Sequence, residues 1–558
     1  MADDADRAFT NYATATVDGL LELQPEWATG VGDHRHDDRL TVGTAGHYEQ
    51  ASRWAGERLA GLAAIGSGSL SPEHRVDAQI LANQLARLRF VIDELREHEW
   101  NPMVANPGRA IYNLLARDYA PLTDRLRCAA RRLAMLPESL AAARSVLGVM
   151  PEIHIETALT QFAGTGRLLS GELMRQAGPP NGAEPDLSRV VPQALDALGE
   201  HTRWLEERLA SGRREGFREP RLGADLFSRK LRLVLDTELP VEQILARAEA
   251  DLARMSGELA AAAAELTGAP ARDEGATVRA ALDSLAADAP DDATILDFVR
   301  VAFGAQRDFV TAHDLVTVFD DPVEVITMPE IDRGVAVAYC DSPGPLETAA
   351  LPTFIAVSPT PEGWTQERVR SFYREYNRHM IHNIMIHEAM PGHALQLQHS
   401  RRFTAASPVR TAWRSGSFVE GWAVYAEQVM NAHGYPGEGN PAALRTQRLK
   451  AKIRSVINAI MDTRVHCLGM TEPEAMALMT GPGHQEEGEA AGKWRRVLLT
   501  SAQLSTYYVG FLEVSGLADG LRREHPDWPE RRLHDAMLAH ASPPARHLRT
   551  LLGAGAAG

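Results

Sequence analysis

Residues 241–266 read VEQILARAEADLARMSGELAAAAAEL, an alanine- and leucine-rich run with charged side chains at intervals. These residue types lose little conformational freedom in a helix, so the run predicts one long helix. Apolar residues at helical spacing also mark residues 80–95. Turn-forming pairs such as Asn101-Pro102 and Gly178-Pro179 separate further runs of this kind. The sequence therefore predicts a mainly α-helical fold.

Short β-prone runs interrupt this helical pattern between residues 321 and 360. They are Val323–Ile326, Gly334–Tyr339 and Thr353–Val357, and proline and glycine lie between them. The chain has 558 residues, more than a single hydrophobic core usually organises. We therefore expect an N-terminal helical lobe (1–320), a small antiparallel β segment that links the lobes (321–360) and a C-terminal helical catalytic lobe (361–558).

Composition excludes several classes of protein. The net charge is −16, the opposite of the balance that general nucleic-acid binders show, so we expect no nucleic-acid partner. Cys128, Cys340 and Cys467 are too far apart to suggest a disulfide framework or a cysteine zinc site. The chain has no uncharged apolar run of about 18 residues, which excludes a membrane helix, and its acidic start has no signal-peptide pattern. We expect a cytoplasmic protein with no membrane partner.

One segment, IHEAMPGHALQ at residues 386–396, carries the chemistry. It places His387, Glu388 and His393 within seven residues. Zinc hydrolases need neutral imidazoles as ligands and a carboxylate that takes a proton from water, so we expect His387 and His393 to bind one Zn²⁺ ion and Glu388 to act as the base.

The spacing of the two histidines predicts a break in their helix. Residues six apart lie about 120° apart around a regular helix, too far to share one ion. Pro391 has no N–H to donate to the carbonyl of His387, and Gly392 tolerates unusual backbone angles. We expect the backbone to break or bulge at residues 390–392 and so bring His393 beside His387.

A second segment, SFVEGWAVYAE at residues 417–427, supplies candidate acids. Glu420 and Glu427 are seven residues apart and share a helix face. Two acids on one face of an apolar, aromatic helix are costly to bury unless they are paired or bind metal. We expect Glu420 to be the third ligand. We expect Glu427 either to hydrogen-bond to one of the ligands or to be the third ligand in place of Glu420.

These two segments resemble the bacterial family of domain of unknown function 885, which looks like a set of gluzincin-type zinc metallopeptidases with an HExxPGH motif. The resemblance extends to Pro25–Thr29 near the start and to residues 503–510, QLSTYYVG, near the end. The family usually has Pro-Gly before that last motif, whereas this chain has Ser501-Ala502. The resemblance implies a helical peptidase with the zinc site in an interior cleft.

Further residues are candidates for the site. Arg454, Asp462 and His466 resemble an R…D…H helix of the family, and their helical spacing lets them share a face. We expect Arg454 to bind substrate and the other two to support the site, with a buried salt-bridge network as the alternative. The hydroxyl of Tyr507 or Tyr508 is a candidate for stabilising an oxyanion, against simple packing.

An arginine-rich stretch, with Arg401, Arg402, Arg410 and Arg414, fits either a substrate carboxylate or a solvated charged face.

The sequence therefore predicts a zinc-dependent hydrolase of a peptide or related amide bond. Two alternatives stay open. One is a mononuclear iron or manganese enzyme acting on a small metabolite, because two histidines and one carboxylate also bind those metals. The other is a non-catalytic peptide-binding protein on a peptidase fold. The sequence does not predict the identity of the substrate, the position of the bond cleaved or the oligomeric state.

Overall fold

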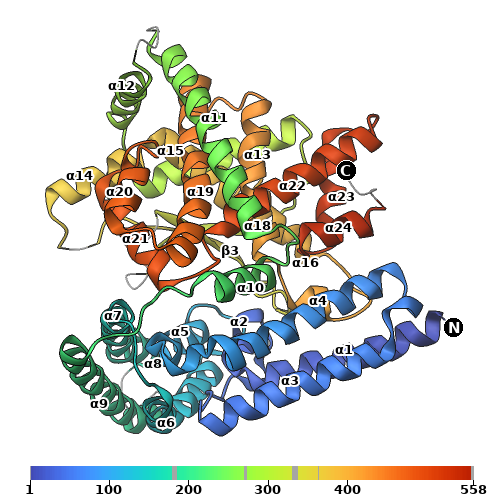
Figure 1. Ribbon diagram of the computed structural model, residues 1–558, viewed down its shortest axis with the longest axis vertical. Coiled ribbons are helices and arrows are strands. Elements are labelled where there is room, and N and C mark those ends of the chain that lie inside the picture. Colours follow the sequence, from blue (N-terminus) through green and yellow to red (C-terminus); the bar gives the residue numbers. More distant parts are fainter. Residues whose placement is uncertain (1, 179–184, 269–272, 330–336, 362, 554–558) are drawn as a thin grey trace. The chain divides into compact units, whose positions relative to one another are not determined.

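The structure is a computed structural model and describes residues 2–178, 185–268, 273–329, 337–361 and 363–553. It is mainly helical, which confirms the mainly α-helical part of the prediction (Figure 1). The chain forms two compact units. Unit 1 contains residues 1–220, 343–351 and 405–412, and unit 2 contains residues 221–342, 352–404 and 413–558.

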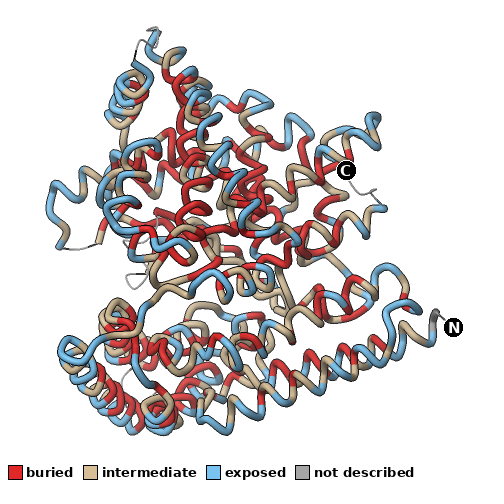
Figure 2. Tube along the Cα trace, viewed as in Figure 1, coloured by how far each residue is buried: buried red, intermediate tan, exposed pale blue. Residues whose placement is uncertain are grey.

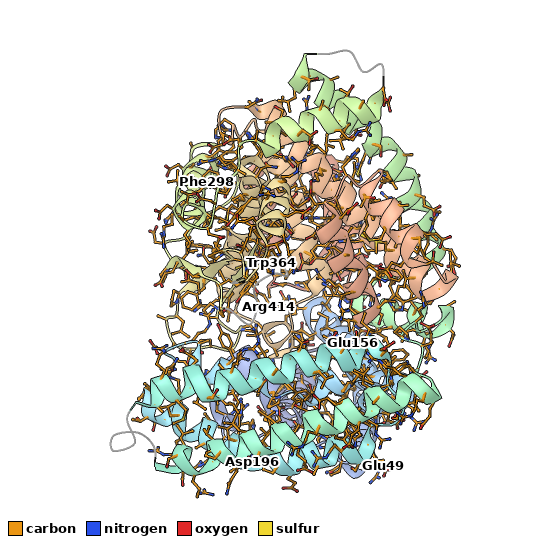
Figure 3. The ribbon with its side chains drawn as sticks, turned by 90° about the vertical axis from the view of Figure 1, so that its left-hand side faces the viewer. Glu49, Glu156, Asp196, Phe298, Trp364 and Arg414 are labelled. Carbon is orange, nitrogen blue, oxygen red and sulfur yellow. The ribbon has the colours of Figure 1, made fainter. Side chains whose placement is uncertain are left out.

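The helices of unit 1 bury apolar side chains, and Leu40 and residues between Ala110 and Leu205 form one apolar cluster. Its long helices carry charged side chains on their outer faces, such as the exposed Glu49 and Asp196 in Figure 3. Its helices are α1 (Ala2–Leu23), α2 (Pro25–Val31), η1 (His34–His36), α3 (Ala45–Ile65), η2 (Ser67–Ser69), α4 (Pro72–Arg89), η3 (Phe90–Leu95), η4 (Glu97–Glu99), η5 (Pro102–Ala105), α5 (Gly108–Leu115), α6 (Leu122–Val146), α7 (Glu152–Leu168), η6 (Leu169–Leu173), α8 (Met174–Ala177), α9 (Pro185–Glu215) and α17 (Val409–Ala412).

Unit 2 holds the remaining helices and the strands. Its helices are α10 (Ala224–Leu235), α11 (Val241–Thr267), α12 (Glu274–Ala286), α13 (Ile295–Ala312), α14 (Gln366–Glu375), α15 (Arg378–Glu388), α16 (His393–Arg401), α18 (Gly416–Ala432), α19 (Pro441–Leu468), α20 (Glu472–Thr480), α21 (Glu487–Leu499), α22 (Ser505–Glu524), α23 (Glu530–Leu538) and α24 (Ala545–Leu551). Helix α11 realises the helix predicted for residues 241–266 almost to the residue.

Two apolar clusters form the interior of unit 2. Helix α11 packs along α19, and α18 packs along α22 (Figure 1). Buried residues follow α18 and α19 along most of their length (Figure 2). Polar side chains on these two helices are therefore held in fixed positions by their neighbours, as a binding site requires.

The small sheet is mixed, so the predicted antiparallel arrangement is wrong. Strand β1 (Val323–Thr327) pairs in parallel with β3 (Thr353–Val357), and β2 (Ala338–Asp341) pairs antiparallel with β3. The order is β1-β3-β2, which leaves β2 at an edge. The segment 328–352 is long enough for the crossover that a parallel pair needs, and sequence runs alone do not show how strands pair. Residues 334–336, part of the predicted second strand, lie outside the described residues.

The compact units do not follow the predicted lobes. Residues 221–320 were grouped by sequence with the N-terminal lobe, but they belong to unit 2. Helix α11 packs against α19 in that unit, more than 170 residues further along the chain. Such packing between distant segments leaves no local signal in the sequence. None of the described helices is long and apolar enough to cross a membrane.

Candidate metal centre

The predicted break in the histidine helix is confirmed. Helix α15 ends at Glu388 and α16 begins at His393. Between them the backbone leaves helical geometry at Ala389 (φ −121°, ψ −81°) and at Gly392 (φ −72°, ψ −133°). The N–H of Gly392 donates to the carbonyl of Ile386 at 2.9 Å. The chain therefore folds back closely on the end of α15.

Two contacts stabilise this turn. A Cβ atom at Gly392 would lie 1.9 Å from the carbonyl oxygen of His387, so a larger residue does not fit this backbone path. The indole N–H of the buried Trp422, on α18, donates to the carbonyl of Pro391 at 2.8 Å. Helix α18 therefore helps to shape the turn that precedes His393.

The turn brings the two histidines together, and Glu420 faces both. Their ring centroids are 4.6 Å apart and the rings are nearly perpendicular. Glu420 on α18 places Oε2 3.2 Å from Nε2 of His387 and 3.6 Å from Nε2 of His393. Ligating atoms of the two histidines and of Glu388 lie within 4.8 Å of one another. Burial alone would raise the pKa of Glu420, but the two histidines hold it below its ordinary value.

Glu427 contacts the opposite edge of His387. Its Oε1 lies 2.8 Å from Nδ1 of His387, and its Oε2 accepts a hydrogen bond from the Asn383 amide at 2.8 Å. Burial opposes a charged His387, yet Glu420 and Glu427 on its two edges raise its pKa well above the ordinary value. Glu427 therefore orients the ring whose other nitrogen faces Glu420.

Glu388 is fixed by the edge strand. Its Oε2 accepts a hydrogen bond from the backbone N–H of Cys340, in β2, at 3.0 Å. Burial raises the pKa of Glu388, and His393 and His387 oppose this rise. The small sheet thus contributes directly to the site, through a contact that periodicity in the sequence does not show.

These groups open into one cavity of about 520 Å³ in unit 2. The residues that supply its walls come from β2, α15, α16, α18, α19, α21 and α22, together with Val337 and Tyr376. A volume of this order is typical of pockets for small molecules.

The two candidate tyrosines separate. Tyr507 lines the cavity, and its ring centroid lies 6.5 Å from that of His387. The neighbouring Tyr508 is buried in the apolar interior, and its hydroxyl donates to Asp251 on α11 at 2.8 Å. Successive helical residues point about 100° apart, so only one of the pair can face the cavity. The prediction that Tyr508 is a catalytic candidate is therefore wrong for this structure.

Arg454, Asp462 and His466 also separate. Arg454 lines the cavity, as its predicted role requires. Asp462 instead accepts hydrogen bonds from the N–H and hydroxyl of Ser505 and from the N–H of Ala502, at the start of α22. Nδ1 of His466 lies 3.4 Å from the N of Leu222, and its Nε2 lies 2.9 Å from the backbone carbonyls of Val497 and Thr500, at the end of α21. Neither residue contacts the histidine pair, so direct support of the metal site is not their role.

Asp462 also supports an unusual backbone conformation at Ala502. Ala502 has φ +63°, in the left-handed region that favours glycine. The hydrogen bond from its N–H to Asp462 holds this conformation.

The arginine-rich stretch does not reach the cavity. Arg410 is fully buried against Asp77 and Glu73, and Arg402 pairs with Asp321. Neither they nor Arg401 and Arg414 line the cavity walls. Among the described residues, the lysine and arginine side chains that line the cavity, besides Arg454, are Lys493 and Arg496 on α21. Lys493 and Arg496 are three residues apart, so they lie on one face of the helix. This spacing is visible in the sequence, but the two residues were not among the predicted site residues.

One family model matches most of the chain. The family model described as "Bacterial protein of unknown function (DUF885)" matches residues 25–552. The chain belongs to this family. None of the curated proteins matches this DUF885 chain.

Two solved structures share the fold. One is described as a "putative lipoprotein of unknown function" from Shewanella oneidensis, with a TM-score of 0.83 and 28% sequence identity over 98% of this chain and 99% of that one. The other is described as a "putative lipoprotein" from Colwellia psychrerythraea, with a TM-score of 0.79 and 17% identity over the same shares. These likenesses support the helical architecture and do not name an activity.

The residues of this DUF885 chain fit a zinc ion in their chemistry and spacing. Nitrogen and oxygen ligands at about 2.0–2.1 Å in a tetrahedral site lie about 3.3 Å from one another. The two distances from Glu420 to the histidines, 3.2 and 3.6 Å, bracket that value. The contact between Nδ1 of His387 and Glu427 leaves Nε2 of His387 to face Glu420.

Proposed function

We propose that this protein is a zinc-dependent hydrolase of peptide or related amide bonds, with His387, His393 and Glu420 as the zinc ligands. The observation that carries the proposal is the convergence of these three side chains beside Glu388, at the wall of one cavity. The broken helix supports it, because an unbroken helix would point the histidines apart.

Each neighbouring group then has a chemical role. Zinc, when bound, lowers the pKa of a water molecule to about 7 and polarises a carbonyl group. Glu388, held by the N–H of Cys340, accepts the proton of the attacking water and passes it to the leaving amine. Tyr507 faces the cavity and donates a hydrogen bond to the carbonyl oxygen as negative charge develops there. Glu427 holds His387 in the orientation that ligation needs.

The position of Glu388 favours hydrolysis over the alternatives. An iron or manganese oxygenase needs two histidines and a carboxylate, but it does not need a further carboxylate held beside them. A peptide-binding protein without activity has no use for a carboxylate held beside two histidines at the cavity wall. Both alternatives remain outcomes of the experiment below.

The test is the substitution Glu388→Gln, which keeps the shape of the side chain but removes the proton acceptor. Protein purified without chelator or nickel is analysed for bound metal and assayed on a panel of peptides and acyl amides. We expect about one zinc per chain in both proteins and a loss of hydrolysis of about 10²–10⁴-fold in the variant. Glu242→Gln, an exposed residue of α11, is the matched control and should leave both unchanged.

Activity of Glu388→Gln within a few-fold of the wild type would exclude Glu388 as the base. Bound iron with oxygen uptake would favour the oxygenase alternative, and zinc without hydrolysis of any amide would favour the binding protein.

A further inference from the structure

A group of positively charged side chains lines the same cavity as the histidines. Arg454 comes from α19, and Lys493 and Arg496 come from α21. The side chains of Arg454 and Lys493 are only 20% and 9% exposed. Cations held at such a wall need negative partners, because burial without a partner is costly.

Acids lie near two of these three cations. Glu489 lies 3.7 Å from Lys493, and its other oxygen accepts a hydrogen bond from Tyr376. Oε2 of Glu375 lies 2.9 Å from Lys450, and its Oε1 lies 3.8 Å from Arg454. Burial lowers the pKa of Arg454, but Tyr376 and the acids Glu489, Glu375 and Glu427 raise it overall, so acids balance Arg454 and only partly balance Lys493.

Arg496 differs from Arg454 and Lys493 because its partners are neutral. Its guanidinium donates to the neutral Gln503 amide oxygen at 2.9 Å and to the Tyr507 hydroxyl at 3.4 Å. Among the described residues, no carboxylate forms an ion pair with Arg496 within 4.0 Å. Repulsion between the cations affects Lys493. Burial lowers the pKa of Lys493 to about 8, and Glu489 opposes this shift. The positive charges of Arg454 and Arg496 lower the pKa further. An anion entering the cavity would relieve this repulsion.

Tyr507 connects this group to the histidines. Its hydroxyl contacts Arg496, and its ring lies 6.5 Å from the ring of His387, centroid to centroid. One residue of extended chain spans about 3.3–3.6 Å, so a substrate with a few residues between its ends can reach both places. The cavity, at about 520 Å³, has the size of a site for such a ligand.

We propose that Arg454, Lys493 and Arg496 bind the free carboxylate of the substrate, so that the substrates are short peptides or acyl-amino acids cleaved near a free C-terminus. The planar guanidinium group of an arginine can donate two parallel hydrogen bonds to the two oxygens of a carboxylate. The amide of Gln503 has a single oxygen and cannot accept such a pair. This inference rests on the proposed function for the cleavage step, but carboxylate binding itself needs no zinc and no reaction.

The experiment measures binding first. Metal-free protein, prepared with a chelator, is titrated calorimetrically with N-acetyl-glycyl-leucine and with its C-terminal amide. We expect the free acid to bind about 10–100-fold more tightly than the amide, as charge-assisted hydrogen bonds imply. Arg496→Gln should remove most of this preference and leave amide binding within a few-fold. Arg495→Gln, the exposed neighbour, is the matched control and should keep the preference.

Equal binding of acid and amide to the wild type would overturn the proposal, as would an Arg496→Gln variant that weakens both equally. If Arg496→Gln fails to fold, the binding of the acid and of the amide is compared in the wild type and in Lys493→Gln instead. Loss of the preference for the acid in Lys493→Gln would support the proposal, and an unchanged preference would contradict it. Hydrolysis of acid and amide substrates by zinc-loaded protein is measured separately. A clear preference for the acid in binding, without hydrolysis of either, would refute the proposed hydrolase and leave the carboxylate site standing.

Discussion

The substitution Gly392→Ala tests whether the turn between α15 and α16 creates the metal centre. The added Cβ would lie 1.9 Å from the carbonyl oxygen of His387 and 2.3 Å from that of Ile386. Non-bonded heavy atoms settle at about 3.5–4.0 Å, so the overlap is about 1.5 Å or more. Both atoms that it meets belong to the backbone and cannot rotate away as a flexible side chain does. The turn itself must therefore move.

The size of this movement sets the expected effect. A shift of about 1 Å in a reacting group costs about 10²-fold in rate, and altered support of a ligand costs about 10–100-fold in metal affinity. Overpacking of this kind costs about 1–3 kcal/mol of stability. We therefore expect zinc affinity to fall at least 10-fold and hydrolysis at least 100-fold, while the protein still folds.

The assay compares two glycine substitutions. Zinc affinity is measured by competition with a chelator, folding by circular dichroism and thermal unfolding. Gly257→Ala, in the exposed middle of α11 with nothing within 4 Å of the new Cβ, is the control. It should raise stability by about 0.5–1 kcal/mol, since alanine is the better helix former. If Gly392→Ala bound zinc as tightly as the wild type and kept its melting temperature, the turn would not be what aligns the histidines.

Two further predictions concern other contacts. Glu427→Ala should retain zinc but bind it about 10–100-fold more weakly, because the orienting partner of His387 is lost; complete loss of zinc in chelator competition would instead make Glu427 a ligand. In unit 1, His34 bridges Asp37 and Glu347 at 2.9 Å each, and although burial lowers its pKa, these two acids raise it overall. A raised pKa in the folded state means that this contact stabilises fully below about pH 6.5 and less as the pH rises through the folded value. Melting curves should therefore show the wild type losing its advantage over His34→Gln between pH 6 and pH 9, and a constant difference would contradict the assignment.

The amino-acid sequence by itself determined the local features of this protein. Helix propensity over residues 241–266 predicted α11, because each residue makes its hydrogen bonds within the helix. The six-residue spacing from His387 to His393, with Pro391 and Gly392 between, predicted the break. The seven-residue spacing of Glu420 and Glu427 placed both on one face. All of these properties depend on neighbours within about two helical turns.

Tertiary structure alone decided which of these residues meet. The parallel pairing of β1 with β3 depends on a crossover between distant segments, so the β-prone runs could not reveal it. Tyr507 and Tyr508 are equivalent by residue type, and only the packing of α22 against its neighbours turns Tyr507 to the cavity and Tyr508 to Asp251. The same packing brings Arg496 to Tyr507 and keeps Asp462 at the start of α22. Side chains on separate helices come together through long-range burial of apolar surface, which has no local signature in the sequence.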